Sequence, residues 1–398
     1  MPENFTFGYC TNVHAGVDLD SAKLSLLRYA SSVREHLRCS DSLPLGLWLS
    51  DTTSEQLAAP AETRQFKHWL SENHFSAYTL NGFPQRDFHE PVVKHAVYEP
   101  TWCTPERRDY TLRLADILSQ LIAGDLGTIS TLPLGWPHQP WSDDDLAAAG
   151  KNLRQVAMRL AELREETGKE IVLAIEPEPG CVLNTAPEIV DFFERYLFVG
   201  EEQAAAQRHL SVCHDICHSS VMFEEQEFAL QQYLDNGIRI GKVQVSAAVH
   251  VPWNELDSTE QTTAAWQQLS EFNEPKYLHQ TTRARDDGKL DSMQEDLPDA
   301  LKQWQPPEPG SPPWRVHFHV PIFVKQFELL RTTQEDIQKV IRFLDSHRTS
   351  QVGPANWFTG HYEVETYAWP VLPKSLAVDD LATGIAREMT FLRDLAQK

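Results

Sequence analysis

Ile171-Val-Leu-Ala-Ile-Glu176 is a short apolar run that ends on a carboxylate, and the same arrangement recurs further along the chain. Leu210-Ser-Val-Cys-His-Asp215 ends on Asp215, Lys242-Val-Gln-Val-Ser246 carries Gln244, and His361-Tyr-Glu-Val-Glu365 ends on Glu365. Short apolar runs are typical of buried parallel strands. Strands that close into a (β/α)8 barrel bring such oxygen-bearing side chains to one rim, where a divalent cation can bind.

Strand and helix patterns alternate along almost the whole chain, which predicts an α/β fold with a parallel sheet. Apolar stripes and capping signals predict helices that end at Gly168, begin at Thr185 and Thr333, and close the chain. The remaining strands are expected over residues 7–12, 45–50, 75–81 and 128–132. About eight such units favour a closed TIM barrel, with residues 1–398 as a single domain.

One region departs from this alternation. Residues 247–313 are polar, and they end in the proline-rich run Pro306–Pro313, which excludes regular structure. A long irregular stretch is usually functional or a lid. We therefore expect an inserted loop region at the catalytic face after the seventh strand, although a surface excursion without a role fits the pattern equally well.

A ninth strand-like run, Trp314–Val320, is one too many for an eight-stranded barrel. We assign residues 316–320 to the insertion and let the last barrel strand end at Glu365. The alternative places residues 317–320 in the barrel and removes residues 242–246 from it.

Composition narrows the class of protein. With 41% hydrophobic and 23% charged residues the chain is typical of a soluble globular protein, and its net charge of -22 argues against nucleic acid or an anionic membrane as partner. We see no apolar run long enough to span a membrane and no signal peptide at the start. Six cysteines without framework spacing favour a reducing compartment, so we expect a cytoplasmic protein.

Two strand ends carry the strongest candidates for chemistry. Glu176 can face the barrel mouth and bind a cation, or it can be a salt-bridged rim residue. Asp215 is followed three residues later by His218, so the carboxylate can bind a cation while the imidazole holds substrate or adds a ligand. Cys213, His214 and Cys217 raise the question of zinc, but a second Cys or His pair at typical spacing is missing.

Weaker candidates follow the alternation of strand side chains. Gln244 lies between two valines and should point into the barrel, as a carbonyl ligand or as a hydrogen-bonded core amide. Glu363 and Glu365 share a face, which requires a cation or a proton between them, and Glu365 is the expected ligand. His317 and His319 also share a face, where they can complete the ligand set of a metal ion or bind a sugar hydroxyl. Alternatively, they are two histidines on a surface strand without a role in binding.

Several of these motifs resemble those of the xylose isomerase-like TIM-barrel superfamily, which includes ketose epimerases, hydroxypyruvate isomerase and endonuclease IV. The similar segments are Ile175–Pro177 with Pro179–Thr185, Asp215-x-x-His218, and Ile240–Gln244, where Lys242 stands in the usual place of a histidine. The resemblance implies a metal site formed by Glu176, Asp215, Gln244 and Glu365.

The whole chain also resembles the metabolite traffic protein EboE family. The segments that carry this resemblance are Gly8–His14, Thr79–Pro84, Arg108–Thr111, His317–Phe323 and Glu363–Trp369. That family is associated with the movement or maturation of secondary metabolites. The epimerases have an arginine after the seventh strand; this chain has Ala247-Ala-Val-His250, which leaves Arg283 or Arg285 as replacements.

Together these features predict a metal-dependent isomerase or epimerase of a sugar-like or cyclitol-like metabolite, with Mn²⁺ or Mg²⁺ as cofactor and Zn²⁺ as the alternative. Glu176 and Glu365 would transfer the proton. The residues expected to bind substrate are His218, His14, Asn81, His317 and His319. Barrels of this superfamily often pair, which allows a homodimer.

Two other functions remain open at this point. One is a non-catalytic binding or escort protein, in which Trp136, Trp141, Trp253 and Trp314 would suit an aromatic ligand. The other is a metal-dependent phosphoester hydrolase.

Overall fold

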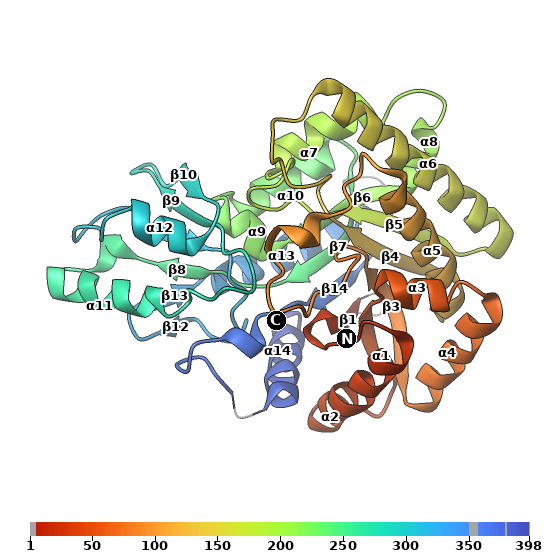
Figure 1. Ribbon diagram of the computed structural model, residues 1–398, viewed down its shortest axis with the longest axis horizontal. Coiled ribbons are helices and arrows are strands. Elements are labelled where there is room, and N and C mark those ends of the chain that lie inside the picture. The colour runs from red at the N-terminus through yellow and green to blue at the C-terminus, as the bar shows by residue number, and fades with distance from the viewer. Residues whose placement is uncertain (1–4, 350–356, 379, 398) are drawn as a thin grey trace.

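Eight parallel strands form a closed barrel in a computed structural model that describes residues 5–349, 357–378 and 380–397 (Figure 1). Around the barrel the strands follow the order β1-β14-β7-β6-β5-β4-β3-β2. The strands are β1 (Thr6–Cys10), β2 (Leu43–Trp48), β3 (Phe75–Asn81), β4 (Leu126–Thr131), β5 (Glu170–Ile175), β6 (Leu210–Asp215), β7 (Arg239–Val245) and β14 (His361–Val364). The predicted (β/α)8 barrel is confirmed.

Helices surround this barrel on the outside (Figure 1). They are α1 (Leu19–Ser25), α2 (Ser31–His36), α3 (Asp51–Gln56), α4 (Pro60–Glu72), α5 (Pro105–Leu121), α6 (Asp143–Thr167), α7 (Ala186–Phe192), α8 (Gln203–His209), α9 (Ile216–Val221), α10 (Gln226–Asp235), α13 (Gln334–Thr349) and α14 (Leu381–Leu395). Short 3-10 or π turns are η1 (Thr11–Val13), η2 (Leu26–Ala30), η3 (Lys94–Tyr98), η4 (Phe193–Leu197), η5 (Trp253–Glu255) and η6 (Trp369–Val371). Among the described residues, none of these helices has the length and apolar character needed to cross a membrane.

Local sequence signals explain where several helices begin and end. The apolar stripe of α6 is buried, and Gly168 ends the helix with φ 74°, a left-handed conformation that glycine adopts without strain. Thr185 and Glu188 form the predicted capping box at the start of α7. Helix α13 begins directly after Thr333, and α14 buries Ile385, Met389 and Leu392 while Leu381 is only partly buried.

A second, antiparallel sheet lies beside the barrel, to the left in Figure 1. It contains β8 (Val249–Val251), β9 (Thr281–Ala284), β10 (Leu290–Gln294), β11 (Trp314–Val316), β12 (Gln326–Phe327) and β13 (Leu330–Thr332), together with α11 (Thr259–Ser270) and α12 (Leu297–Gln303). Residues 247–313, expected to be an irregular loop, therefore contain strands and helices, and their sheet continues to Thr332. Within this region the proline-rich run 306–313 has neither helix nor strand, as predicted.

Strand pairing decides which candidate strand lies outside the barrel. β14 pairs with both β1 and β7, whereas β11 pairs with β8 and β9 of the second sheet. Residues 316–320 therefore lie outside the barrel, as we assigned them, but only Val316 is in a strand of the second sheet, and β14 ends at Val364, one residue before Glu365. The segment that carries His317 and His319 runs from β11 back toward the barrel, where the Val320 amide donates to the Ala247 carbonyl oxygen.

A fully buried ion pair lies inside the barrel. Lys242 Nζ is 2.5 Å from Glu363 Oε2, and both side chains are 0% exposed. Burial disfavours the charge on Lys242, but the Glu363 carboxylate keeps the pKa of Lys242 above its usual value. Glu363 thus has Lys242 as its partner and serves the barrel core.

Gly46 makes room for this ion pair, because a Cβ atom there would overlap Oε1 of Glu363. We expect Gly46→Ala to lower the free energy of unfolding by about 1–3 kcal/mol, the usual cost of overpacking a core. Gly124→Ala is the matched control, since a Cβ at that exposed glycine has nothing within 4 Å. Denaturant unfolding of both variants tests this, and equal effects would contradict it.

Candidate metal centre

Three carboxylates meet at the C-terminal rim of the barrel. Glu176 directly follows β5, Asp215 ends β6, and Glu365 directly follows β14. One oxygen from each lies within 4.8 Å of the others, and all three residues are buried. The backbone therefore brings together residues that are far apart in sequence, in the geometry that the strand order predicted.

His319 completes this group with a nitrogen. Its Nδ1 is 2.5 Å from the Glu365 carbonyl oxygen, which only accepts, so Nδ1 carries the proton and Nε2 has a free lone pair. Nε2 lies 3.9 Å from Asp215 Oδ2, and neither atom has a hydrogen-bond partner. Two ligands that each lie about 2.1 Å from a cation are at most about 4.2 Å apart, so one cation can bridge this gap. The residues fit a divalent metal ion.

The electrostatics of the group also favour a cation. Burial, together with Glu365 and Asp215, raises the pKa of Glu176 well above its usual value. Burial and Asp215 likewise raise the pKa of Glu365 to about 8. Burial alone would raise the pKa of Asp215. The neighbouring His218 and His319, together with hydrogen bonds from the His218 amide and the Ser246 hydroxyl, nevertheless keep this pKa below its usual value. A bound cation would stabilise all three negative charges.

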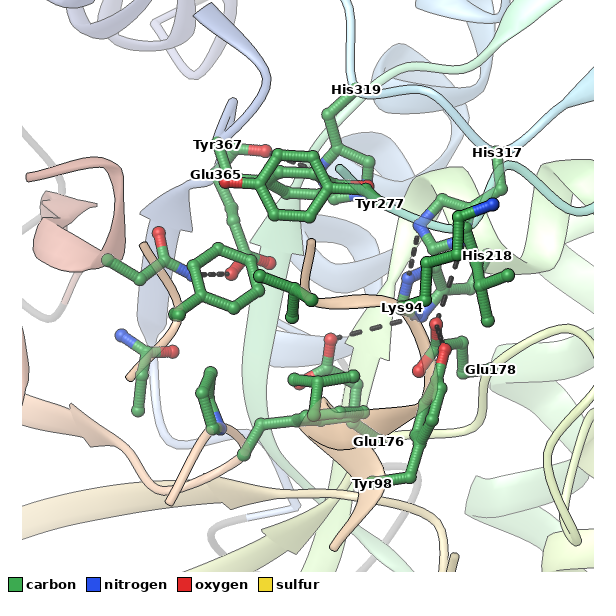
Figure 2. A pocket seen from close by; sticks show the side chains of 18 residues that line it. Lys94, Tyr98, Glu176, Glu178, His218, Tyr277, His317, His319, Glu365 and Tyr367 are labelled. Atoms are coloured by element: carbon green, nitrogen blue, oxygen red, sulfur yellow. Dashed lines mark hydrogen bonds and ion pairs between the residues drawn. The ribbon is translucent and has the colours of Figure 1, made fainter. Parts of the chain in front are cut away.

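A cavity of about 620 Å³, including its open mouth, lies over this group (Figure 2). Its polar lining consists of Asn12, Asn81, Lys94, Glu176, Glu178, His218, His317, His319 and Glu365. The remaining wall is mainly apolar and aromatic: Phe83, Pro84, Phe88, Val93, Val97, Tyr98, Tyr277, Leu278 and Tyr367.

Most residues predicted to bind substrate line this cavity, but His14 does not. His14 lies 3.1 Å from the Tyr9 hydroxyl and stacks on Tyr29 at 4.7 Å, because η1 carries it away from the cavity after β1. Gln244 is also absent from the lining; its Nε2 donates to Asn81 at 3.1 Å, and its Oε1 has no hydrogen-bond partner. The free Oε1 leaves Gln244 as a predicted ligand.

The arginines and tryptophans proposed from sequence lie elsewhere. Arg283 is partly buried on β9 and pairs with Asp291 of β10, and the exposed Arg285 pairs with Asp287 in the turn between these strands. Trp253 and Trp314 pack edge to face at 5.6 Å in the core of that sheet, so neither is an exposed aromatic. Trp136 is buried as well, and Trp141 is partly buried; neither lines the cavity over the carboxylates.

Sequence reasoning missed several cavity residues, and Glu178, Tyr98 and Asn12 are those with polar contacts at the site. Glu178 accepts a 2.7 Å hydrogen bond from Tyr98, and Asn12 donates to Glu365 Oε1 at 2.8 Å. Glu178 had a local signal, since it stands two residues after Glu176 and shares its neighbouring prolines. Asn12 had one too, because it ends the strand predicted over residues 7–12. Tyr98 had none, because it reaches the site from the turn η3, which no strand pattern marks.

Comparison with known proteins yields structural likeness alone. No family model matches the chain, and no curated protein matches it. A xylose isomerase domain protein from Alicyclobacillus acidocaldarius is 10% identical, with 98% of this chain and 99% of that chain covered and a TM-score of 0.47. A xylose isomerase domain-containing protein from Salmonella typhimurium LT2 is 12% identical over 100% of both chains, with a TM-score of 0.44. An L-ribulose 3-epimerase is 13% identical over 68% of this chain and 79% of its own, with a TM-score of 0.40.

Likenesses this distant carry no argument about function, and membership of the EboE family stays a prediction. The fold is assigned from the strand pairing in this chain, and the site is described from the distances between its own side chains.

Proposed function

We propose that this protein is a divalent-cation-dependent isomerase or epimerase of a sugar-like or cyclitol-like small molecule. The observation that carries the proposal is the convergence of Glu176, Asp215 and Glu365 at the C-terminal rim of the barrel, where Glu176 and Glu365 also line the cavity and His319 Nε2 faces Asp215. Three oxygen ligands favour Mn²⁺ or Mg²⁺, while the imidazole also admits Zn²⁺.

A cation bound there would polarise substrate oxygens and make a neighbouring C–H bond more acidic. Glu176 and Glu365 both line the cavity and can remove that proton and return it. Asn12 orients Glu365 for this role through its hydrogen bond to Oε1.

The two other functions have less support. The escort protein was based on exposed tryptophans, and Trp253 and Trp314 are buried. A phosphoester hydrolase would bind its metal ion through the same carboxylates, so an experiment must distinguish hydrolysis from isomerisation. A role in secondary metabolism, a cytoplasmic location and a homodimer remain predictions from sequence.

Solvent exchange gives a direct test of the reaction type. With Mn²⁺ bound, we expect deuterium from D₂O to enter one carbon-bound position of a substrate from a panel of ketoses and cyclitols. Phosphate release from sugar phosphates without deuterium uptake would favour the hydrolase, and binding of panel members without any exchange would favour the escort.

Cation affinity should depend on pH. Because the pKa of Glu365 is raised to about 8, a cation must displace a proton below that pH. Protonation of Glu365 should therefore lower the apparent affinity by up to about tenfold for each pH unit below about pH 8, and protonation of Glu176, whose pKa is also raised, should add to this loss. Titration calorimetry in two buffers of different ionisation enthalpy measures both affinity and proton release. A pH-independent affinity would contradict the assignment of Glu365 as a ligand.

A further inference from the structure

The cavity over the carboxylates has a polar and an apolar part, which come from different segments of the chain. Its polar side chains stand at the ends of barrel strands, shortly after them, or on the segment His317–His319, with Lys94 as the exception. Its apolar side chains come mostly from the loop between β3 and α5 and from the segment between α11 and β9. The loop contributes Phe83, Phe88, Val93 and Val97, and the segment contributes Tyr277 and Leu278.

This loop and this segment are held together as one apolar wall. The Val93 amide donates to the Lys276 carbonyl oxygen at 2.8 Å, and Phe88 stacks on Tyr277 with ring centroids 5.1 Å apart. Tyr277 in turn packs edge to face on Tyr367 at 5.0 Å, as Figure 2 shows. A wall that is already packed loses little conformational freedom when a ligand binds to it.

The wall offers few polar side-chain atoms to a ligand. The Tyr98 hydroxyl already donates to Glu178 at 2.7 Å, so its ring remains for contact. The hydroxyls of Tyr277 and Tyr367 are neutral, because burial raises the pKa of both groups. A free sugar carries a hydroxyl on almost every carbon, and each hydroxyl buried without a partner weakens binding. The cavity therefore suits a ligand with one polar and one apolar end.

The charge of the wall is already balanced. Lys94 is the one lysine or arginine among the lining residues in the described part of the chain, and its Nζ lies 2.6 Å from Asp296 Oδ2. The other oxygen of Asp296 accepts from the His279 and Leu297 amides, which holds this carboxylate in place. Phosphate groups are usually bound by Arg or Lys side chains or at helix N-termini, and here a phosphate would compete with Asp296 for Lys94. The apolar end of the ligand is therefore expected to be uncharged.

We propose that the substrate is an uncharged polyol or hydroxyketone that carries an aryl group. Its oxygen atoms bind at the cation and the polar residues from the barrel, and its aryl ring packs on the wall near Phe88 and Leu278. Aromatic rings gain from edge-to-face and offset stacking in addition to burial, which favours an aryl group at this wall. The substrate class named here rests on the proposed function, since it concerns the same site.

Three forms of one sugar test the proposal. Cation-loaded protein is titrated by calorimetry with D-fructose, with its 6-O-benzyl ether and with its 6-phosphate, and then with the same three forms of D-tagatose. For at least one sugar, we expect the benzyl ether to bind about 10–100-fold more tightly than the parent, which is the gain from burying one phenyl ring. The phosphate should bind no more tightly than the parent, because Lys94 is already paired.

Leu278→Ala should lower this preference for the benzyl ether by at least about fivefold, because it removes part of the wall. Leu256→Ala is the matched control. The two leucines are 6% and 7% exposed and both lie within residues 247–313, but Leu256 does not line the cavity. It should leave the preference unchanged. Circular dichroism and thermal unfolding establish that each variant is folded, and the three forms on the unaltered protein decide the matter if one is not.

Deuterium uptake from D₂O, measured on the same probes, distinguishes the substrate class from the reaction. Tighter binding of a benzyl ether with uptake at a carbon-bound position supports both, and tighter binding without uptake by any probe supports the aryl-bearing ligand and rejects the proposed reaction. Uptake by a parent sugar whose benzyl ether binds no better, or a phosphate that binds most tightly, overturns the aryl group and leaves the proposed function intact. A protein that binds its cation but none of the probes also overturns the aryl group.

Discussion

Glu365→Gln is expected to lower the affinity for the cation by at least about 100-fold and to abolish deuterium exchange, because it removes one of the converging carboxylates and the proposed proton carrier. The same change should stabilise the cation-free protein. Between the pKa of Glu365 in the unfolded chain and its pKa of about 8 in the folded protein, only the unfolded chain releases the proton, so the folded protein loses stability as pH rises. Glutamine cannot ionise and avoids this loss. The stability gain should therefore be absent in acid and largest above about pH 8. Calorimetry and denaturant unfolding measure the two effects.

Glu388→Gln provides the matched control for the cation effect. Glu388 is a second buried carboxylate with a pKa raised to about 7 by burial, and it lies on α14, where it accepts hydrogen bonds from Thr366, Trp369 and the Ile322 amide. Cation affinity should be unchanged in this variant. Equal losses in both variants would show that Glu365 acts only through the fold, and a Glu365→Gln variant that binds normally would reject it as a ligand.

Lys242→Met is expected to lower the free energy of unfolding by about 3–5 kcal/mol, because it leaves the Glu363 carboxylate buried without its partner. The loss includes the 2.8 Å hydrogen bond from Lys242 to Asn81. Denaturant unfolding at neutral pH measures the change.

The double variant Lys242→Met with Glu363→Gln separates the interaction energy between these two side chains from the energy of their contacts with other residues. A buried pair replaced on both sides is often tolerated, so most of the lost stability should return. If the double variant is as unstable as the sum of both single variants, the two side chains are not energetically coupled. Lys242→Met alone costing less than about 1 kcal/mol would also contradict a stabilising role for the pair.

The barrel could be predicted because its signals are local and repeat. Each strand has its own apolar run, and each helix has its own apolar stripe and capping residues. Eight alternating strand and helix units are compatible with few chain topologies. The same logic found Glu176, Asp215 and Glu365, since parallel strands end on one rim whatever the detailed packing. The second sheet was harder to predict because its strands are short and pair across large sequence separations, as β11 does with β8.

His14 and Glu363 show where strand position alone misleads. Both stand at or near the end of a barrel strand, yet His14 packs on Tyr29 and Glu363 pairs with Lys242. Which partner a polar side chain finds depends on distant residues, and no local pattern contains that information.

The sequence by itself determined the parallel barrel, the rim on which its carboxylates gather and the negative charge of the whole chain. Only the tertiary structure decided that β14 closes the barrel, that His319 faces Asp215, and that His218 and His317 face each other across 3.1 Å. The physical reason is that secondary structure follows short-range periodicity, whereas a binding site depends on side-chain directions and proton positions set by contacts between remote segments. Pro177 and Gln280, whose oxygens lie within hydrogen-bond distance of Nδ1 of His218 and of His317, are such contacts.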